Sequence, residues 1–195
     1  MKGFGIDFGT TNSLIAYYNT DIAREPKAFM DDRRPHPSLA WYRPDSATPV
    51  VGWAAREQMY QVQNRMGHAF VHSVKRAMAD GREIPLIGNS RKASHAVGAD
   101  ILSYLVNHAR ATDRAAATGL DACVFTVPVN STGRYRKQLR QAAELAGLRV
   151  ESFAHEPFAA VFGYYFAQHA DLRRLPPHKV LVFDWGGGTL DITLV

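Results

Sequence analysis

Two segments, one near each end of the 195-residue chain, carry an aspartate, an aromatic residue, glycine and threonine in the same order. They are residues 5–13 (GIDFGTTNS) and 182–191 (VFDWGGGTLD). Glycine allows the backbone to approach a ligand closely, and successive backbone N–H groups in such a turn form a concavity that binds anions. A single turn of this kind is often a plain hairpin, but the repeated order predicts a pair of phosphate-binding loops.

Each turn offers backbone and hydroxyl donors to phosphate oxygens. The predicted phosphate-binding residues are Gly9, Thr10, Thr11 and Asn12 in the first loop, and Gly186, Gly187, Gly188 and Thr189 in the second. The aspartates need another role because a carboxylate and a phosphate repel each other. Asp7 and Asp184 fit the water shell of a Mg²⁺ ion that bridges phosphates. Asp191 is either a further member of that shell or an edge-strand charge.

Two common phosphate-binding fingerprints are excluded by the residues that follow the glycines. No Gly-Lys-Ser/Thr follows either turn, so neither is a Walker A loop. A strand rather than a helix is expected after each turn, so neither is a dinucleotide fingerprint. We therefore expect the first loop to be the turn of a β-hairpin with strands at residues 2–7 and 13–18.

Alternating strands and helices are expected before the second loop. In order they are a strand at 122–127, a helix at 133–146, a strand at 149–153, a helix from Pro157, a linker at 172–178 and a strand at 179–184. Ser131 or Thr132 is the expected N-cap of the first helix, and Gly147 the residue that ends it in the left-handed conformation. The second helix carries an apolar stripe of Phe158, Val161, Phe162, Tyr165 and Phe166. This alternation predicts an α/β layered domain.

The middle of the chain is less regular. Short strands are expected at residues 38–42 and 49–51, and helices at 53–66 and 99–109. Residues 84–97 are polar and contain Pro85, Gly88 and Asn89, so they are expected to form a loop or the edge of a small subdomain.

Composition limits the class of protein. Hydrophobic residues make up 46% of the chain, which is enough for a core and argues against disorder. The net charge is +5, but the densest basic cluster falls on one expected helix without interleaved aromatics, so we expect no nucleic-acid binding. Cys123 is the single cysteine and is expected to be a buried thiol in a reducing, cytoplasmic compartment. We expect neither a signal peptide nor a membrane span.

The order of these motifs resembles that of DnaK-type (seventy-kilodalton heat-shock) chaperones. Residues 5–13 and 183–193 are similar to the two phosphate loops of the actin, sugar-kinase and heat-shock chaperone superfamily. Between them lie three segments that resemble chaperone elements: residues 73–76 (SVKR), residues 125–128 (FTVP) with the helix after them, and residues 155–160 (HEPFAA). Phe8, Trp185 and Phe158 depart from the family pattern, which suggests a divergent DnaK-like paralogue.

The resemblance implies an α/β fold, the first lobe of an actin-like (ribonuclease H-like) ATPase domain. We expect a mixed sheet with flanking helices in a core subdomain of about residues 1–36 and 112–195, and a smaller α/β subdomain of about residues 37–111. The implied cofactors are ATP or ADP and Mg²⁺. The family's second lobe, which completes the nucleotide cleft, is not in this sequence, so we expect the chain alone to bind ATP weakly and to be inactive.

The resemblance also implies roles for residues outside the glycine turns. Lys75 matches the lysine that positions the attacking water, although an isolated lysine is more often a surface residue. Glu156 would orient or deprotonate that water. Its ordinary role is that of a first-turn carboxylate interacting with the helix dipole, which is compatible with the first. Asp184 and Thr189 complete the implied catalytic set. Pro128 and Arg136 match a relay between the ATP site and a substrate-binding domain.

Three functions are consistent with these residues. The first is a chaperone ATPase that acts on client polypeptides together with co-chaperones. The second is an ATP-dependent small-molecule kinase of the same superfamily, against which the chaperone-like segments argue. The third is a non-hydrolysing, nucleotide-sensing interaction module. The presence of Asp7, Lys75, Glu156, Asp184 and Thr189 together favours hydrolysis.

Overall fold

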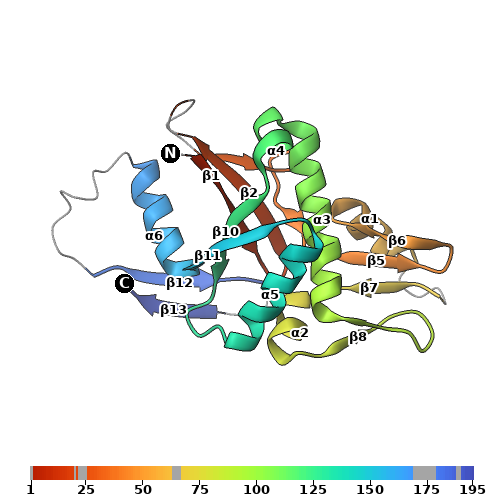
Figure 1. The fold of residues 1–195 in the computed structure, drawn as a ribbon. Helices are drawn as coiled ribbons and strands as arrows, with labels where there is room; N and C mark the ends of the chain where they lie inside the picture. Colours follow the sequence, from red (N-terminus) through yellow and green to blue (C-terminus); the bar gives the residue numbers. More distant parts are fainter. Residues whose placement is uncertain (1, 20, 22–25, 63–66, 169–178, 188–189) are drawn as a thin grey trace.

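A six-stranded mixed sheet forms the centre of the molecule (Figure 1). The structure is a computed structural model that describes residues 2–19, 21, 26–62, 67–168, 179–187 and 190–195. The strands are β1 (Lys2–Phe8), β2 (Asn12–Asn19), β3 (Lys27–Phe29), β4 (His36–Pro37), β10 (Ala122–Val127) and β11 (Arg149–His155). Their order is β11-β10-β1-β2-β3, with β4 paired to β2. Strands β11, β10 and β1 are parallel, whereas β2, β3 and β4 join antiparallel.

Helices pack against the sheet and supply about half of the buried residues of the main core. They include α2 (Val74–Asp80), α3 (Ser94–Thr112), α4 (Arg114–Gly119) and α5 (Gly133–Leu145). Leu102 and Leu105 of α3 and Leu139 of α5 are buried in one cluster with Ile6 and Phe125 of the sheet. The mixed α/β fold with flanking helices is therefore confirmed. No helix in the described part of the chain has the length and apolar character needed to cross a membrane.

The residues at the two ends of α5 adopt the capping roles that the sequence predicts. Thr132 is the N-cap, and its hydroxyl accepts a hydrogen bond from the backbone N–H of Tyr135 at 3.2 Å. Gly147 follows the helix with φ 74°, the left-handed conformation that glycine adopts without strain. Cys123 is fully buried, and this burial raises the pKa of its thiol to about 12. The cysteine is therefore an unreactive core residue.

A smaller sheet lies at one end of the molecule (Figure 1). It contains β5 (Ala40–Arg43), β6 (Ser46–Val51) and β7 (Ala69–Val71) in the order β6-β5-β7, beside α1 (Trp53–Val62). The predicted helix at 53–66 is thus confirmed as far as Val62, and residues 63–66 lie outside the described residues. A separate cluster of Leu39, Trp41, Ala55 and Val62 packs this end.

The expectation for residues 84–97 was partly wrong. They take part in a hairpin of β8 (Glu83–Pro85) and β9 (Arg91–Ala93), and α3 already begins at Ser94. Gly88, with φ 63°, lies between the two strands, so the residue taken as a sign of a loop forms part of a hairpin connection.

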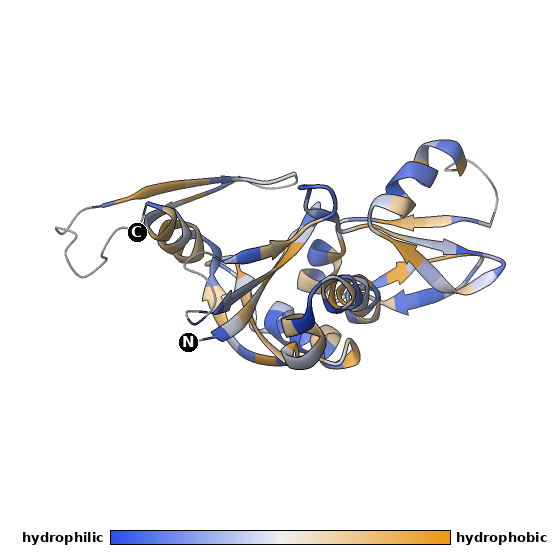
Figure 2. Ribbon diagram, turned by 90° about the horizontal axis from the view of Figure 1, so that it is seen from above, coloured by the Kyte–Doolittle hydropathy of each residue, from blue (hydrophilic) through white to orange (hydrophobic). Residues whose placement is uncertain are grey.

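The second glycine turn belongs to a hairpin of its own at the opposite end. Strand β12 (Leu181–Trp185) pairs with β13 (Leu190–Leu194), and among the described strands the two pair only with each other. The hairpin lies beside α6 (Glu156–Ala167) rather than within the main sheet (Figure 2). The predicted apolar stripe of α6 is present, but Phe158 and Phe162 are exposed. The linker predicted at 172–178 lies outside the described residues.

Candidate active site

The two glycine turns line one cavity of about 510 Å³, although their sequences lie at opposite ends of the chain. Both aspartates that precede the turns, Asp7 and Asp184, are in its lining. The other predicted residues that line it are Gly9, Thr10, Thr11, Asn12, Lys75, Glu156, Gly186 and Gly187. Gly188 and Thr189 lie outside the described residues. The arrangement therefore brings both hairpins and the two predicted water-handling residues to a single space.

Close packing explains why glycine occupies two of the turn positions. A Cβ atom on Gly9 would overlap the backbone carbonyl of Asn12, and one on Gly187 would overlap the side chain of Thr11. The second overlap shows that the two loops contact each other, because Gly187 follows β12 and Thr11 lies between β1 and β2. Any larger residue at position 187 would push the hairpins apart.

Asp7 is oriented by a residue that the sequence did not single out. The hydroxyl of Thr126, on β10, donates a hydrogen bond to Asp7 Oδ1 at 2.9 Å. The contact exists because β1 and β10 are parallel neighbours, with Ile6 opposite Phe125. Thr126 is the one hydroxyl residue in an otherwise apolar strand, which is the signal that could have identified it. The bond fixes the carboxylate while leaving Oδ2 available to the cavity.

Lys75 and Glu156 form the closest ion pair of the site. Lys75 Nζ donates to Glu156 Oε1 at 2.6 Å, and the two side chains are only 14% and 15% exposed. Lys75 comes from α2, which begins after Ser73 in a left-handed conformation (φ 57°). Glu156 opens α6 directly after β11. Lys75 and Glu156 are 81 positions apart in the sequence, and α2 and α6 bring them side by side at the cavity wall.

The surroundings of Glu156 increase its affinity for a proton. Burial is the main cause that raises the pKa of its carboxyl, Lys75 opposes the rise, and Asp7 and Asp184 add to it. Lys75 is therefore the group that favours the ionised form of this carboxylate. A carboxylate held in this way can accept a hydrogen bond from a water molecule in the cavity.

The acidic residues fit a metal ion that is held through water. Asp184 and Asp191 lie opposite each other across the β12–β13 hairpin, and Asp191 lines an adjoining pocket with Asp184 and Glu156. Within the described ranges, no three His, Cys, Asp or Glu side chains gather closely enough to hold a metal ion directly. Carboxylates are among the ligands that Mg²⁺ uses, and this ion usually keeps several of its waters when it binds to a protein.

The predicted relay residues, Pro128 and Arg136, lie near the start of α6, and Pro128 lines the two pockets that share Glu156 with the main cavity. Pro128 follows β10, and its carbonyl accepts a hydrogen bond from Ser131 N at 3.0 Å. The Arg136 guanidinium donates to Ser131 Oγ at 3.0 Å and to His155 Nε2 at 3.3 Å. His155, which the sequence reasoning did not propose, immediately precedes Glu156. A chain of contacts thus runs from the Pro128 turn through Arg136 to the start of α6.

Comparison with known proteins gives consistent matches. The family model described as Hsp70 protein matches residues 3–195. The chain is 34% identical to the chaperone protein HscA of Serratia proteamaculans over 98% of its length, covering 32% of that protein. It is 30% identical to the chaperone protein DnaK of Ureaplasma urealyticum serovar 10, also over 98% of its length, covering 29% of the relative. The chain therefore spans about a third of the length of these relatives.

Proposed function

The chain belongs to the Hsp70 family, and on that premise we propose that it forms the phosphate-binding part of a Mg²⁺-dependent, ATP-hydrolysing chaperone domain. The observation that carries the proposal is the single cavity lined by both glycine turns, Asp7, Asp184 and the Lys75–Glu156 pair. The matches to chaperones disfavour the small-molecule kinase.

In the proposed site the chain supplies positioning and electrostatic stabilisation. Backbone N–H groups of the two turns and the hydroxyls of Thr10 and Thr11 donate to phosphate oxygens. Asp7 and Asp184 would accept hydrogen bonds from the water shell of a bound Mg²⁺ ion, which would neutralise charge on the phosphates. Donors that are already in place before reaction need no reorganisation as charge develops.

Hydrolysis itself requires a water molecule aligned with the terminal phosphorus. We assign this task to Lys75, which donates to the oxygen of the water, and to Glu156, which accepts one of its protons. The water oxygen then bonds to phosphorus as the bond to the leaving ADP oxygen breaks, giving inorganic phosphate. The ion pair between Lys75 and Glu156 holds both groups at the cavity wall before the nucleotide arrives.

Communication with clients is the second part of the proposal. Because its relatives are named as chaperones, we propose that the full-length protein acts on client polypeptides with the help of co-chaperones. Arg136 forms hydrogen bonds with His155, the residue before Glu156, and with Ser131 in the turn after Pro128. Through these two bonds, a change at the hydrolysis site can shift the Pro128 turn. The buried free thiol of Cys123 supports a cytoplasmic location.

Replacement of Lys75 tests the catalytic assignment. In the full-length protein, Lys75→Ala should lower the single-turnover rate of ATP hydrolysis by about a hundredfold or more, as expected for loss of a preorganised donor. Lys92→Ala is the matched control, because Lys92 forms an ion pair of similar length with Asp100 at 2.5 Å, away from the cavity. Equal rates for the Lys75→Ala variant and the wild type would remove the assignment.

A further inference from the structure

The hydroxyl of Tyr135 is a buried donor that has no protein partner. Tyr135 lies in the first turn of α5 and is only 3% exposed, and its Oη makes no hydrogen bond among the described residues. Among the described residues, the other buried side-chain atoms without a hydrogen bond are the Nε atoms of Arg43 and Arg56, whose guanidinium groups carry further nitrogens. A phenol has one polar atom, so its burial without a partner is costly and requires an explanation.

Tyr135 lines a side pocket that joins the active site. The pocket has a volume of about 230 Å³ and lies between α2, the turn after Pro128 and the start of α5. It shares Thr10, Lys75 and Glu156 with the main cavity, so the two spaces adjoin at the Lys75–Glu156 pair. A water molecule occupies about 30 Å³ of liquid volume, so the pocket can hold several.

The lining of the side pocket offers polar and charged partners to water. Its polar residues include Asn130, Ser131 and Thr132. Its charged residues are of both signs, because Lys75 and Arg76 line it together with the carboxylates of Glu156 and Asp191. A molecule that links the phenol to a carboxylate must accept a hydrogen bond from the first and donate one to the second. Water does both, and its usual two to four polar partners are available here.

We propose that ordered water in the side pocket links the Tyr135 hydroxyl to the Glu156 carboxylate, and that Tyr135 is a positioning residue for this glutamate. The hydroxyl donates to the water, and the water donates to the carboxylate. The link stabilises the ionised form of Glu156 and restricts the rotation of its side chain. The inference rests on the water-orienting role proposed above for Glu156.

The electrostatic surroundings are consistent with this direction of hydrogen bonding. Burial raises the pKa of the Tyr135 phenol, and the negative charges of Glu156 and Asp7 raise it further, so the hydroxyl remains a donor. Charged and titratable groups from the neighbouring elements lie around Glu156. They are Lys75 and Arg76 of α2, Asp7 of β1, Asp184 of β12, Asp191 of β13, and His155 of β11 with its partner Arg136 of α5.

A crystal structure of the chain at a resolution that shows ordered water tests the link directly. The expected result is a water molecule within hydrogen-bonding distance of both Tyr135 Oη and a Glu156 carboxylate oxygen, or two waters in series. In Tyr135→Phe the water bound to the hydroxyl should be lost or displaced. A dry pocket, or a direct bond from Tyr135 Oη to another protein atom, would overturn the proposal. This observation does not depend on ATP turnover.

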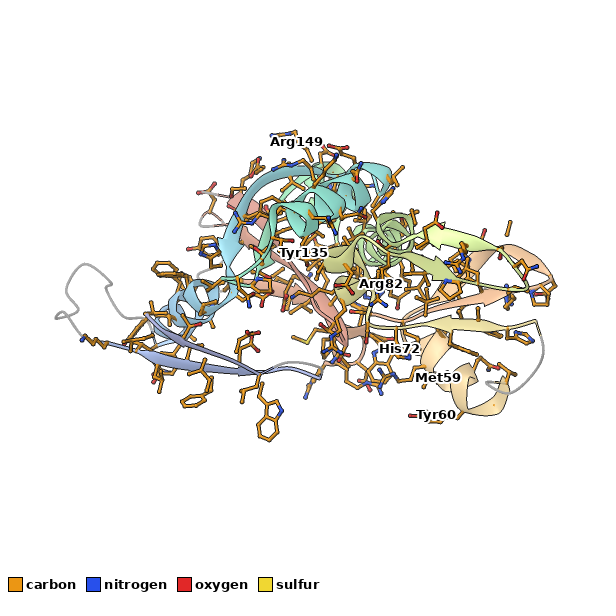
Figure 3. The ribbon with its side chains drawn as sticks, turned by 90° about the horizontal axis from the view of Figure 1, so that it is seen from below. Met59, Tyr60, His72, Arg82, Tyr135 and Arg149 are labelled. Atoms are coloured by element: carbon orange, nitrogen blue, oxygen red, sulfur yellow. The ribbon has the colours of Figure 1, made fainter. Side chains whose placement is uncertain are left out.

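Kinetics of Tyr135→Phe in the full-length protein test the effect on Glu156. The variant keeps the ring and removes one hydrogen bond, so kcat should fall about threefold to tenfold while KM for ATP stays unchanged. The acid limb of the kcat profile should move to higher pH, because the carboxylate loses a stabilising donor. Tyr60→Phe is the control, since Tyr60 is 77% exposed on α1, far from Tyr135 (Figure 3).

The two proposals fail in different ways. An unchanged kcat and pH profile together with a raised melting temperature would show that the Tyr135 hydroxyl is a dry, unsatisfied group, and would overturn the inference alone. Unchanged turnover in Glu156→Gln would instead remove the proposed role of Glu156, whatever the crystal structure shows at Tyr135.

Discussion

Removal of Lys75 should destabilise the chain in a way that depends on pH. Lys75→Ala leaves the Glu156 side chain, which is only 15% exposed in the wild type, without its ion-pair partner. Breaking a buried pair by removing one member costs about 3–5 kcal/mol. For a chain of this size each kcal/mol corresponds to roughly 2–4 °C. The melting temperature at neutral pH should therefore fall by about 6–20 °C.

The pH dependence identifies the cause. The pKa of Glu156 is already raised by burial, and Lys75 is the group that lowers it. Without Lys75 the folded-state pKa rises further, so the folded state binds a proton that the unfolded state has released. The free energy of unfolding of the variant therefore falls as the pH rises from the ordinary carboxyl pKa of the unfolded chain through the raised pKa of the folded state. Lys75→Ala should consequently be closer to the wild type at pH 5 than at pH 7.5.

Thermal unfolding of the chain at both pH values provides the assay. The double variant Lys75→Met/Glu156→Gln removes both charges and should recover most of the lost stability. Lys92→Ala serves as the control, because its partner Asp100 also contacts Tyr42 and lies outside the site. An equal loss for Lys75→Ala at pH 5 and pH 7.5, with no recovery in the double variant, would refute the reasoning.

Three further predictions concern the rest of the site. Gly187→Ala should weaken ADP binding to the full-length protein by tenfold or more in calorimetry, because the added methyl forces the loops apart, whereas Gly163→Ala, which meets no atom within 4 Å, should not. Thr126→Val should raise the Mg²⁺ concentration for half-maximal ATP turnover about threefold to tenfold, since Asp7 loses its orienting bond. Arg136→Ala should reduce stimulation of turnover by a client peptide more than it reduces the unstimulated rate, and equal reductions would contradict the relay.

Features that depend on neighbouring residues were predictable from the sequence. The first hairpin, the Thr132 cap and the Gly147 helix end follow from residue types whose conformational preferences act over a few positions. The repeated order of aspartate, aromatic residue and glycine also indicated that the two loops act together. They do line one cavity, although no spacing in the sequence measures the distance between them.

Features that depend on distant packing were not predictable. The Thr126–Asp7 bond joins residues that are 119 positions apart, and it arises only because β1 and β10 are parallel neighbours. The sequence shows Tyr135 as one member of an apolar helix stripe, and only the packing of α5 reveals that its hydroxyl is buried without a protein partner. The exposed faces of α6 and of the β12–β13 hairpin likewise cannot be inferred from an apolar pattern, which predicts a buried face.

The most direct test of the central claim is the Mg²⁺ dependence of ADP binding, measured by calorimetry on the full-length protein and on its Asp7→Asn and Asp184→Asn variants. Both aspartates line the cavity between the glycine turns, so Mg²⁺ should strengthen ADP binding in the wild type, and each substitution should remove most of that gain. Binding that is the same with and without Mg²⁺, or a gain that survives both substitutions, would contradict the account.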